Sequence, residues 1–76
     1  MEALAIEEIC RRARALRLST KAFAALAGLN PGTVYDAVER RCRPSERTRR
    51  KMTEALVAEE RAELKRLAAL HGQTDL

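Results

Sequence analysis

The sequence predicts an all-α fold, a bundle of four helices of which the last is extended. Fourteen alanines and ten leucines among the 76 residues favour helix. No segment alternates apolar and polar residues with the period of two that a strand requires. Breaks at Ser19, at residues 28–31 and at Pro44 divide the chain into four helix-forming segments.

The first helix is expected over about residues 2–17. One stripe of an amphipathic helix is formed by apolar residues at i, i+3, i+7 and i+10, which are Ile6, Ile9, Ala13 and Leu16. Glu7–Arg11 and Glu8–Arg12 have the spacing and order of favourable i,i+4 ion pairs.

Two short helices follow with only about three residues between them. Ser19 is a good N-cap for the second helix, and Gly28 ends it because glycine readily adopts the left-handed conformation. Asn30 then caps a third helix, expected over 31–40, with Pro31 at its first position. Helices joined so tightly cross at a steep angle, as in a helix-turn-helix. A plain αα-hairpin is the alternative.

The fourth helix is the longest. Ser45 can cap it after the break at Pro44, and no Gly or Pro occurs from Glu46 to His71, which predicts one helix of about 25 residues and ~37 Å. Its apolar residues form two patches, one of Met52, Ala55 and Leu56 and one of Leu64, Leu67, Ala68 and Leu70. We therefore expect a domain over 1–57 and a helical extension over 58–76.

The positive charge is concentrated in the middle of the chain. Residues 10–50 carry eleven of the fifteen Lys and Arg residues but three of the eleven acids. Six arginines lie within residues 40–50, and their planar guanidinium groups suit phosphate and base-edge contacts. A polyanionic partner is the favoured interpretation, and a solvated surface is the alternative. Three acids of the fourth helix are expected to form a solvated face: Glu59, Glu60 and Glu63.

Residues 20–39 resemble the helix-turn-helix of the Cro and lambda-repressor-like (Xre-type) family of phages and bacteria. The family pattern of apolar, small and glycine positions is matched by Phe23, Ala24, Ala27, Gly28, Leu29 and Val34. The following segment of the family also has a counterpart here, through Pro44, Ser45, Thr48, Arg50, Lys51, Met52, Ala55 and Leu56. The resemblance covers about residues 10–57 and implies a lambda-repressor-like bundle.

The chain departs from the family pattern in three places. Ala37 stands where a large aliphatic residue is usual, with Val38 beside it. Thr20 and Pro31 stand where the family often has glutamines that contact phosphate and base. The fourth helix also continues where the family usually breaks after the Ala-Leu pair.

The resemblance implies sequence-specific binding in the major groove of double-stranded DNA. Base contacts are expected from the exposed face of helix 31–40, namely Asn30, Gly32, Thr33, Tyr35 and Asp36. Phosphate contacts are expected from the flanking residues Thr20, Lys21, Arg40, Arg41, Arg43 and Arg47. A place for Tyr35 in the core is the alternative.

A single domain of this kind reads few base pairs, so the family usually binds as a dimer at half-sites about 34 Å apart. We expect a homodimer contact through Leu64, Leu67 and Leu70. The alternative is that this patch folds back on the first helix near Leu4 and Ile6.

The leading hypothesis is a cytoplasmic transcriptional regulator, a repressor that occupies its operator. Two alternatives stay open: an antitoxin-like module whose C-terminal helix binds another protein, and a nonspecific nucleic-acid binder. No nucleophile–base constellation, metal-ligand spacing or glycine-rich phosphate loop occurs, so neither an enzyme nor a cofactor is expected. No apolar run approaches the ~20 residues of a membrane span.

Overall fold

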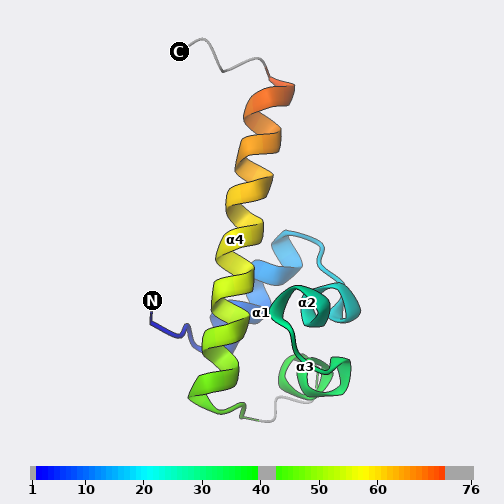
Figure 1. The fold of residues 1–76 in the computed structure, drawn as a ribbon, viewed down its shortest axis with the longest axis vertical. Helices are drawn as coiled ribbons and strands as arrows, with labels where there is room; N and C mark the ends of the chain where they lie inside the picture. Colours follow the sequence, from blue (N-terminus) through cyan, green and yellow to red (C-terminus); the bar gives the residue numbers. More distant parts are fainter. Residues whose placement is uncertain (1, 40–42, 72–76) are drawn as a thin grey trace.

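The structure, a computed structural model, describes residues 2–39 and 43–71. This part of the chain contains four helices and no strand: α1 (Ile6–Ala15), α2 (Thr20–Ala27), α3 (Pro31–Val38) and α4 (Glu46–Leu70) (Figure 1). The all-α prediction and the order of the four helices are confirmed. Of these helices, none is both long and apolar enough to cross a membrane.

Helix α1 begins later than the sequence predicts, at Ile6 instead of residue 2. The backbone N–H of Leu4 donates to Thr53 Oγ1 over 3.0 Å, and Arg49 Nη1 donates to the Leu4 carbonyl over 3.2 Å. In a helix that began at residue 2, the Leu4 carbonyl would accept from the N–H of Glu8, but here it accepts from Arg49. The chain stays extended to Ala5, with ψ 149°.

Helix α1 also ends two residues earlier than expected, at Ala15. The N–H of Leu18 donates to the Ala13 carbonyl over 3.1 Å, and the N–H of Arg17 donates to the Arg14 carbonyl over 2.9 Å. This is the Schellman pattern, which requires a left-handed residue just past the helix. Here that residue is Arg17, with φ 59°, and not a glycine.

The predicted caps of α2 and α3 are confirmed. Ser19 Oγ accepts from the Ala22 N–H over 3.1 Å, and Asn30 Oδ1 accepts from the Gly32 N–H over 2.7 Å. Gly28 ends α2 with φ 68°. Helix α3 ends at Val38, with Glu39 as its C-cap, which is shorter than the expected 31–40.

Helix α4 forms as predicted, over 25 residues. Ser45 Oγ accepts from the Thr48 N–H over 3.2 Å and so caps its first turn. The core lies against the first half of α4 and contains Ile9, Ala13, Phe23, Ala24, Val34, Ala37, Met52 and Leu56. Ala37, at the position where the family has a larger residue, is fully in this core, and Val38 packs against it from a partly buried position.

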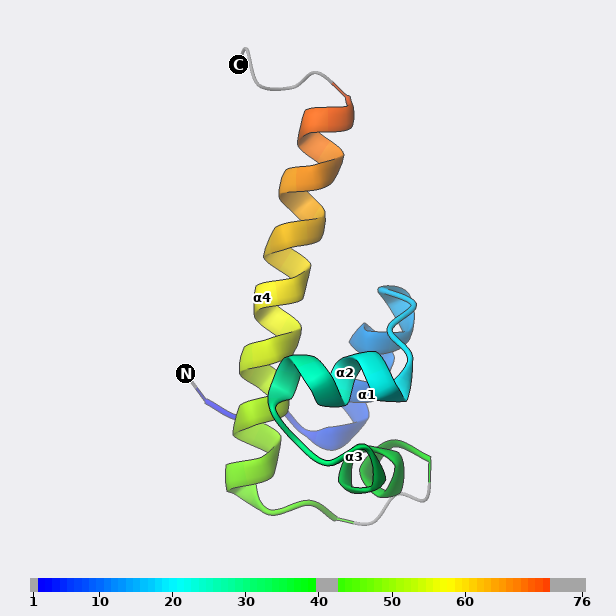
Figure 2. The ribbon, with the colours of Figure 1, turned by 45° about the vertical axis from the view of Figure 1, so that its right-hand side comes forward.

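The second half of α4 projects beyond the other helices (Figures 1 and 2). Leu64 and Leu70 are 69% and 68% exposed, and Leu67 is 40% exposed. The alternative that this patch folds back on α1 is wrong, because Leu4 and Ile6 pack against the core cluster instead.

The expectation of a solvated acidic face on α4 is wrong for Glu60, which is bound by a residue of another helix. Arg12 of α1 binds the Glu60 carboxylate with two guanidinium donors, one of them Nε over 2.8 Å to Oε2. Glu63 pairs with Arg66 over 2.6 Å. Arg12 therefore turns mainly to Glu60, and its predicted partner Glu8 lies 3.9 Å away and pairs more closely with Arg11.

Candidate nucleic-acid interface

The candidate site is built on α2, α3 and the three residues that join them. The N–H of Leu29 donates to the Ala24 carbonyl over 2.9 Å, and the Asn30 carbonyl accepts from the N–H groups of Thr33 and Val34. Phe23, Ala24 and Val34 are 2% exposed or less. The small Ala24 lets α3 approach α2 closely, and the joint is fixed by backbone bonds on both sides.

The face of α3 that points away from the core carries most of the residues selected from the sequence. Asn30, Gly32 and Thr33 are exposed, and Asp36 is partly buried. Tyr35 is 50% exposed, so the alternative that it belongs to the core is wrong.

The chemistry of this face is set by what each side chain already binds. Asn30 Oδ1 accepts one hydrogen bond, from the Gly32 N–H in the cap of α3. Its second lone pair and its amide NH₂ can still serve a base edge. The Thr33 hydroxyl, as donor or acceptor, and the Tyr35 ring remain at the surface for a partner.

The arginine-rich stretch separates into residues with different roles. Arg50 pairs with Glu46 over 2.8 Å, and Arg49 holds the backbone of Leu4. Arg43 and Arg47 are exposed. Neither of them has a hydrogen bond or an ion pair within the described part of the chain.

The exposed residues Arg43 and Arg47 lie at the same end of the molecule as α3. Figures 1 and 2 place α3, the segment that leads to α4 and the first turn of α4 at the same end, opposite the C-terminal end of α4. Lys21 is exposed and Thr20 partly buried at the N-terminal end of α2. Arg40 and Arg41, also predicted to contact phosphate, lie outside the described residues.

Sequence reasoning missed Arg14, an exposed residue of α1 that lines a groove together with Arg43. The opposite wall of that groove, with Val38 and Arg43, is far from Arg14 in sequence, so no local pattern marks Arg14 as part of a groove. Among residues 2–39 and 43–71, no cluster of three His, Cys, Asp or Glu side chains is placed to hold a metal ion. No protein-family model, curated protein or solved structure matches the chain, so its site is assigned from its own geometry.

Proposed function

We propose that the protein is a non-catalytic, sequence-specific regulator of transcription that binds double-stranded DNA through the major groove, and that it represses by occupying its site. One observation carries this proposal: α2 and α3 form a capped pair joined by backbone hydrogen bonds, and the outer helix exposes Thr33 and Tyr35 at the end of the molecule where Arg43 and Arg47 are exposed. Such a pair has the properties of a helix-turn-helix, and α3 is then the recognition helix.

The size of α3 suits this role. An α-helix with its side chains is about 10–12 Å in diameter, and the major groove, about 12 Å wide, admits one. The eight residues of α3 would lie in the groove with the N-terminal turn toward the bases. Base contacts then come from the Asn30 amide, the Thr33 hydroxyl and methyl, and Tyr35. Asp36 reads a cytosine amino group or orients a neighbouring cation.

Phosphate contacts flank the recognition helix. Arg43 and Arg47 supply donors on one side, and Thr20 and Lys21 supply them from the start of α2. The adjacent arginines at positions 40 and 41 belong to the same proposed clamp. About five such contacts predict that log Kd changes with log salt with a slope of about 4 to 5.

The proposed regulator acts as a homodimer joined through the second half of α4. Leu64, Leu67 and Leu70 are exposed on the part of α4 that projects beyond the other described helices, and contiguous apolar surface of this kind marks interaction sites. Two copies would present two recognition helices to successive half-sites.

DNA binding is tested by selecting duplexes from a randomised pool and measuring fluorescence anisotropy on the selected duplex and on a scrambled one. A preference of about a hundredfold or more is expected at physiological salt. Thr33→Val and Tyr35→Ala should reduce the preference for the selected duplex. Arg47→Gln should instead weaken binding to both duplexes equally and lower the slope of log Kd against log salt by about 1. Lys65→Gln, at the opposite end of the molecule, is the matched control.

Equal affinity for both duplexes, with a steep dependence on salt, would instead show that the protein binds nucleic acid nonspecifically. No affinity for either duplex would overturn the proposal.

Sedimentation velocity tests the dimer. The double variant Leu64→Glu/Leu67→Glu should sediment as a monomer, and the neighbouring surface variant Lys65→Glu should remain a dimer. A wild-type chain that is monomeric at all concentrations would favour the second candidate, an antitoxin-like module in which the same exposed leucines bind another protein.

A further inference from the structure

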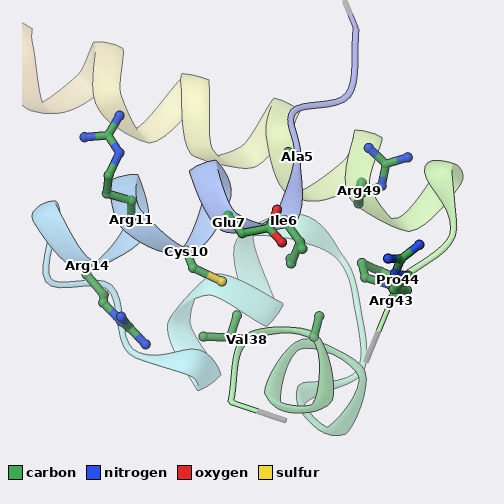
Figure 3. A pocket seen from close by; sticks show the side chains of 11 residues that line it. Ala5, Ile6, Glu7, Cys10, Arg11, Arg14, Val38, Arg43, Pro44 and Arg49 are labelled. Carbon is green, nitrogen blue, oxygen red and sulfur yellow. The ribbon is translucent and has the colours of Figure 1, made fainter. Parts of the chain in front are cut away.

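A groove of about 620 Å³ lies between α1, the C-terminal end of α3, and Arg43 and Pro44, which precede α4 (Figure 3). Small-molecule sites typically measure about 300–1,000 Å³. Of the described residues proposed to contact DNA, Arg43 alone lines this groove. The groove is therefore a separate feature that touches the proposed DNA surface at one point.

The middle of the groove is apolar. Ile6, Cys10, Val38 and Pro44 contribute to its lining, and each is partly buried, so each leaves some of its surface to a ligand. In Figure 3, Ile6, Cys10 and Val38 lie between two groups of arginines, and Pro44 lies beside Arg43. An apolar body of moderate length would cover this surface.

The ends of the groove are cationic. Arg11 and Arg14 of α1 lie at one end, and Arg43 and Arg49 lie at the other (Figure 3). Glu7 is the one acid among the described lining residues. The groove therefore complements a negatively charged ligand.

Two of the four arginines already have partners. Arg11 binds Glu8 over 2.5 Å, and Arg49 binds the Leu4 carbonyl. Within the described part of the chain, the guanidinium groups of Arg14 and Arg43 have neither a hydrogen bond nor an ion pair. Arg43 adjoins Pro44 and can offer a carboxylate two parallel donors.

We propose that the groove binds a small amphipathic carboxylate, with its head group on Arg43 and its apolar body over Ile6 and Val38. The ligand regulates the protein because Arg43, once it holds a carboxylate, no longer holds a DNA phosphate. This regulatory step rests on the proposed function, whereas the binding step does not.

The binding step is tested by titrating the ¹⁵N-labelled protein with decanoate and following backbone amide shifts. Saturable shifts are expected at Ile6, Cys10 and Val38, and decyltrimethylammonium, with the same chain and opposite charge, should not produce them. Arg43→Gln should weaken decanoate binding about tenfold. Arg47→Gln, an exposed arginine outside the groove, should bind decanoate as the wild type does.

Shifts confined to residues 61–70 would overturn the assignment, because decanoate would then only coat the exposed leucines. Unchanged decanoate binding by Arg43→Gln would overturn it as well.

The regulatory step is tested by measuring DNA binding with decanoate present. Saturating decanoate should weaken binding to the selected duplex several-fold, and an unchanged affinity would overturn the regulatory step. A chain that binds decanoate in the groove but binds no duplex would refute the proposed function and leave the groove assignment standing.

Discussion

The two halves of α4 have the same helical geometry but opposite surroundings. In the first half, Met52, Thr53 and Leu56 are 2% exposed or less. In the second half, Leu64 is 69% exposed although it continues the same kind of apolar pattern. The difference arises because the other helices lie only against the first half (Figure 2).

Among the described residues, the Arg12–Glu60 pair is the hydrogen-bonded ion pair furthest along α4 that joins it to another helix. Beyond it the helix depends on local terms, such as the Glu63–Arg66 pair and the helix propensity of alanine. Periodicity therefore predicts which side chains share a helix face, but burial depends on whether a second element lies alongside. The following predictions test this division.

The largest expected effect is a difference between two leucine truncations. Leu56→Ala should lower the free energy of unfolding by about 3 kcal/mol, because it empties a filled position in the core. Leu64→Ala should change it by less than about 0.5 kcal/mol in the monomer, because its side chain is already in water. Urea denaturation at low protein concentration measures both values.

Protein concentration sharpens this first prediction. If α4 dimerises as proposed, the stability of the wild type rises with concentration and that of Leu64→Ala does not. The loss caused by Leu56→Ala should be the same at every concentration. Equal losses from the two truncations at low concentration would contradict the division of α4 into a packed and a projecting half.

The second prediction concerns Thr53, the buried hydroxyl of the packed half. Its Oγ1 accepts from the Leu4 N–H and donates to the Arg49 carbonyl over 2.7 Å. Thr53→Val should cost about 1–2 kcal/mol, because it leaves the Leu4 N–H without its partner. Thr53→Ser keeps the hydroxyl and is the control. Urea denaturation of both variants separates the hydrogen bond, which Thr53→Val removes, from the methyl group, which Thr53→Ser removes. A Thr53→Val variant as stable as the wild type would contradict a role for the bond.

Thr53 also shows where sequence reasoning reaches its limit. The starts of α2, α3 and α4 were predictable because Ser19, Asn30 and Ser45 cap them locally. The start of α1 was not predictable, because it is set by hydrogen bonds from Leu4 to Arg49 and Thr53, which are 45 and 49 positions away in the sequence. Its end was missed because Arg17 takes a conformation that usually requires glycine.

The candidate site also has features that the sequence predicted and features that it did not. The exposure of Thr33 and Tyr35 followed from the helical period and the buried positions of Val34 and Ala37. The separate roles of the arginines did not follow, because Arg49 acts on a segment at the other end of the sequence. DNA binding itself remains a prediction.

The third prediction compares two glutamates of α4. Hydrogen bonds from Arg12 lower the pKa of Glu60 below its ordinary value of 4.5, against the opposing effect of desolvation. A lowered pKa means that the pair contributes its full stability above the ordinary pKa and loses it as the pH falls through the lowered value. Glu60→Gln should cost about 0.5–1 kcal/mol at neutral pH, since both side chains are partly exposed.

Glu63→Gln is the control, because its pair with Arg66 lies within the projecting half and joins no second helix. Its effect on unfolding at neutral pH should be smaller than that of Glu60→Gln. Thermal unfolding followed from pH 7 down to pH 3 should show that the difference between wild type and Glu60→Gln narrows in acid. A difference that stays constant from pH 7 to pH 3 would show that packing, and not the ion pair, is what Glu60 contributes.

The smallest effect is expected from glycine placed in each region. Arg17 has φ 59°, a conformation that costs a side-chain-bearing residue about 1–2 kcal/mol and costs glycine little beyond its chain entropy. Arg17→Gly should therefore raise the free energy of unfolding by about 0.5 kcal/mol. Lys65→Gly, in the exposed helix interior, should instead lower the helix signal in circular dichroism and leave global unfolding nearly unchanged, because that half packs on nothing in the monomer. Arg17→Ala, which keeps a Cβ, separates conformation from side-chain contacts: a gain in stability with alanine as large as that with glycine would show that the left-handed backbone is not the cause.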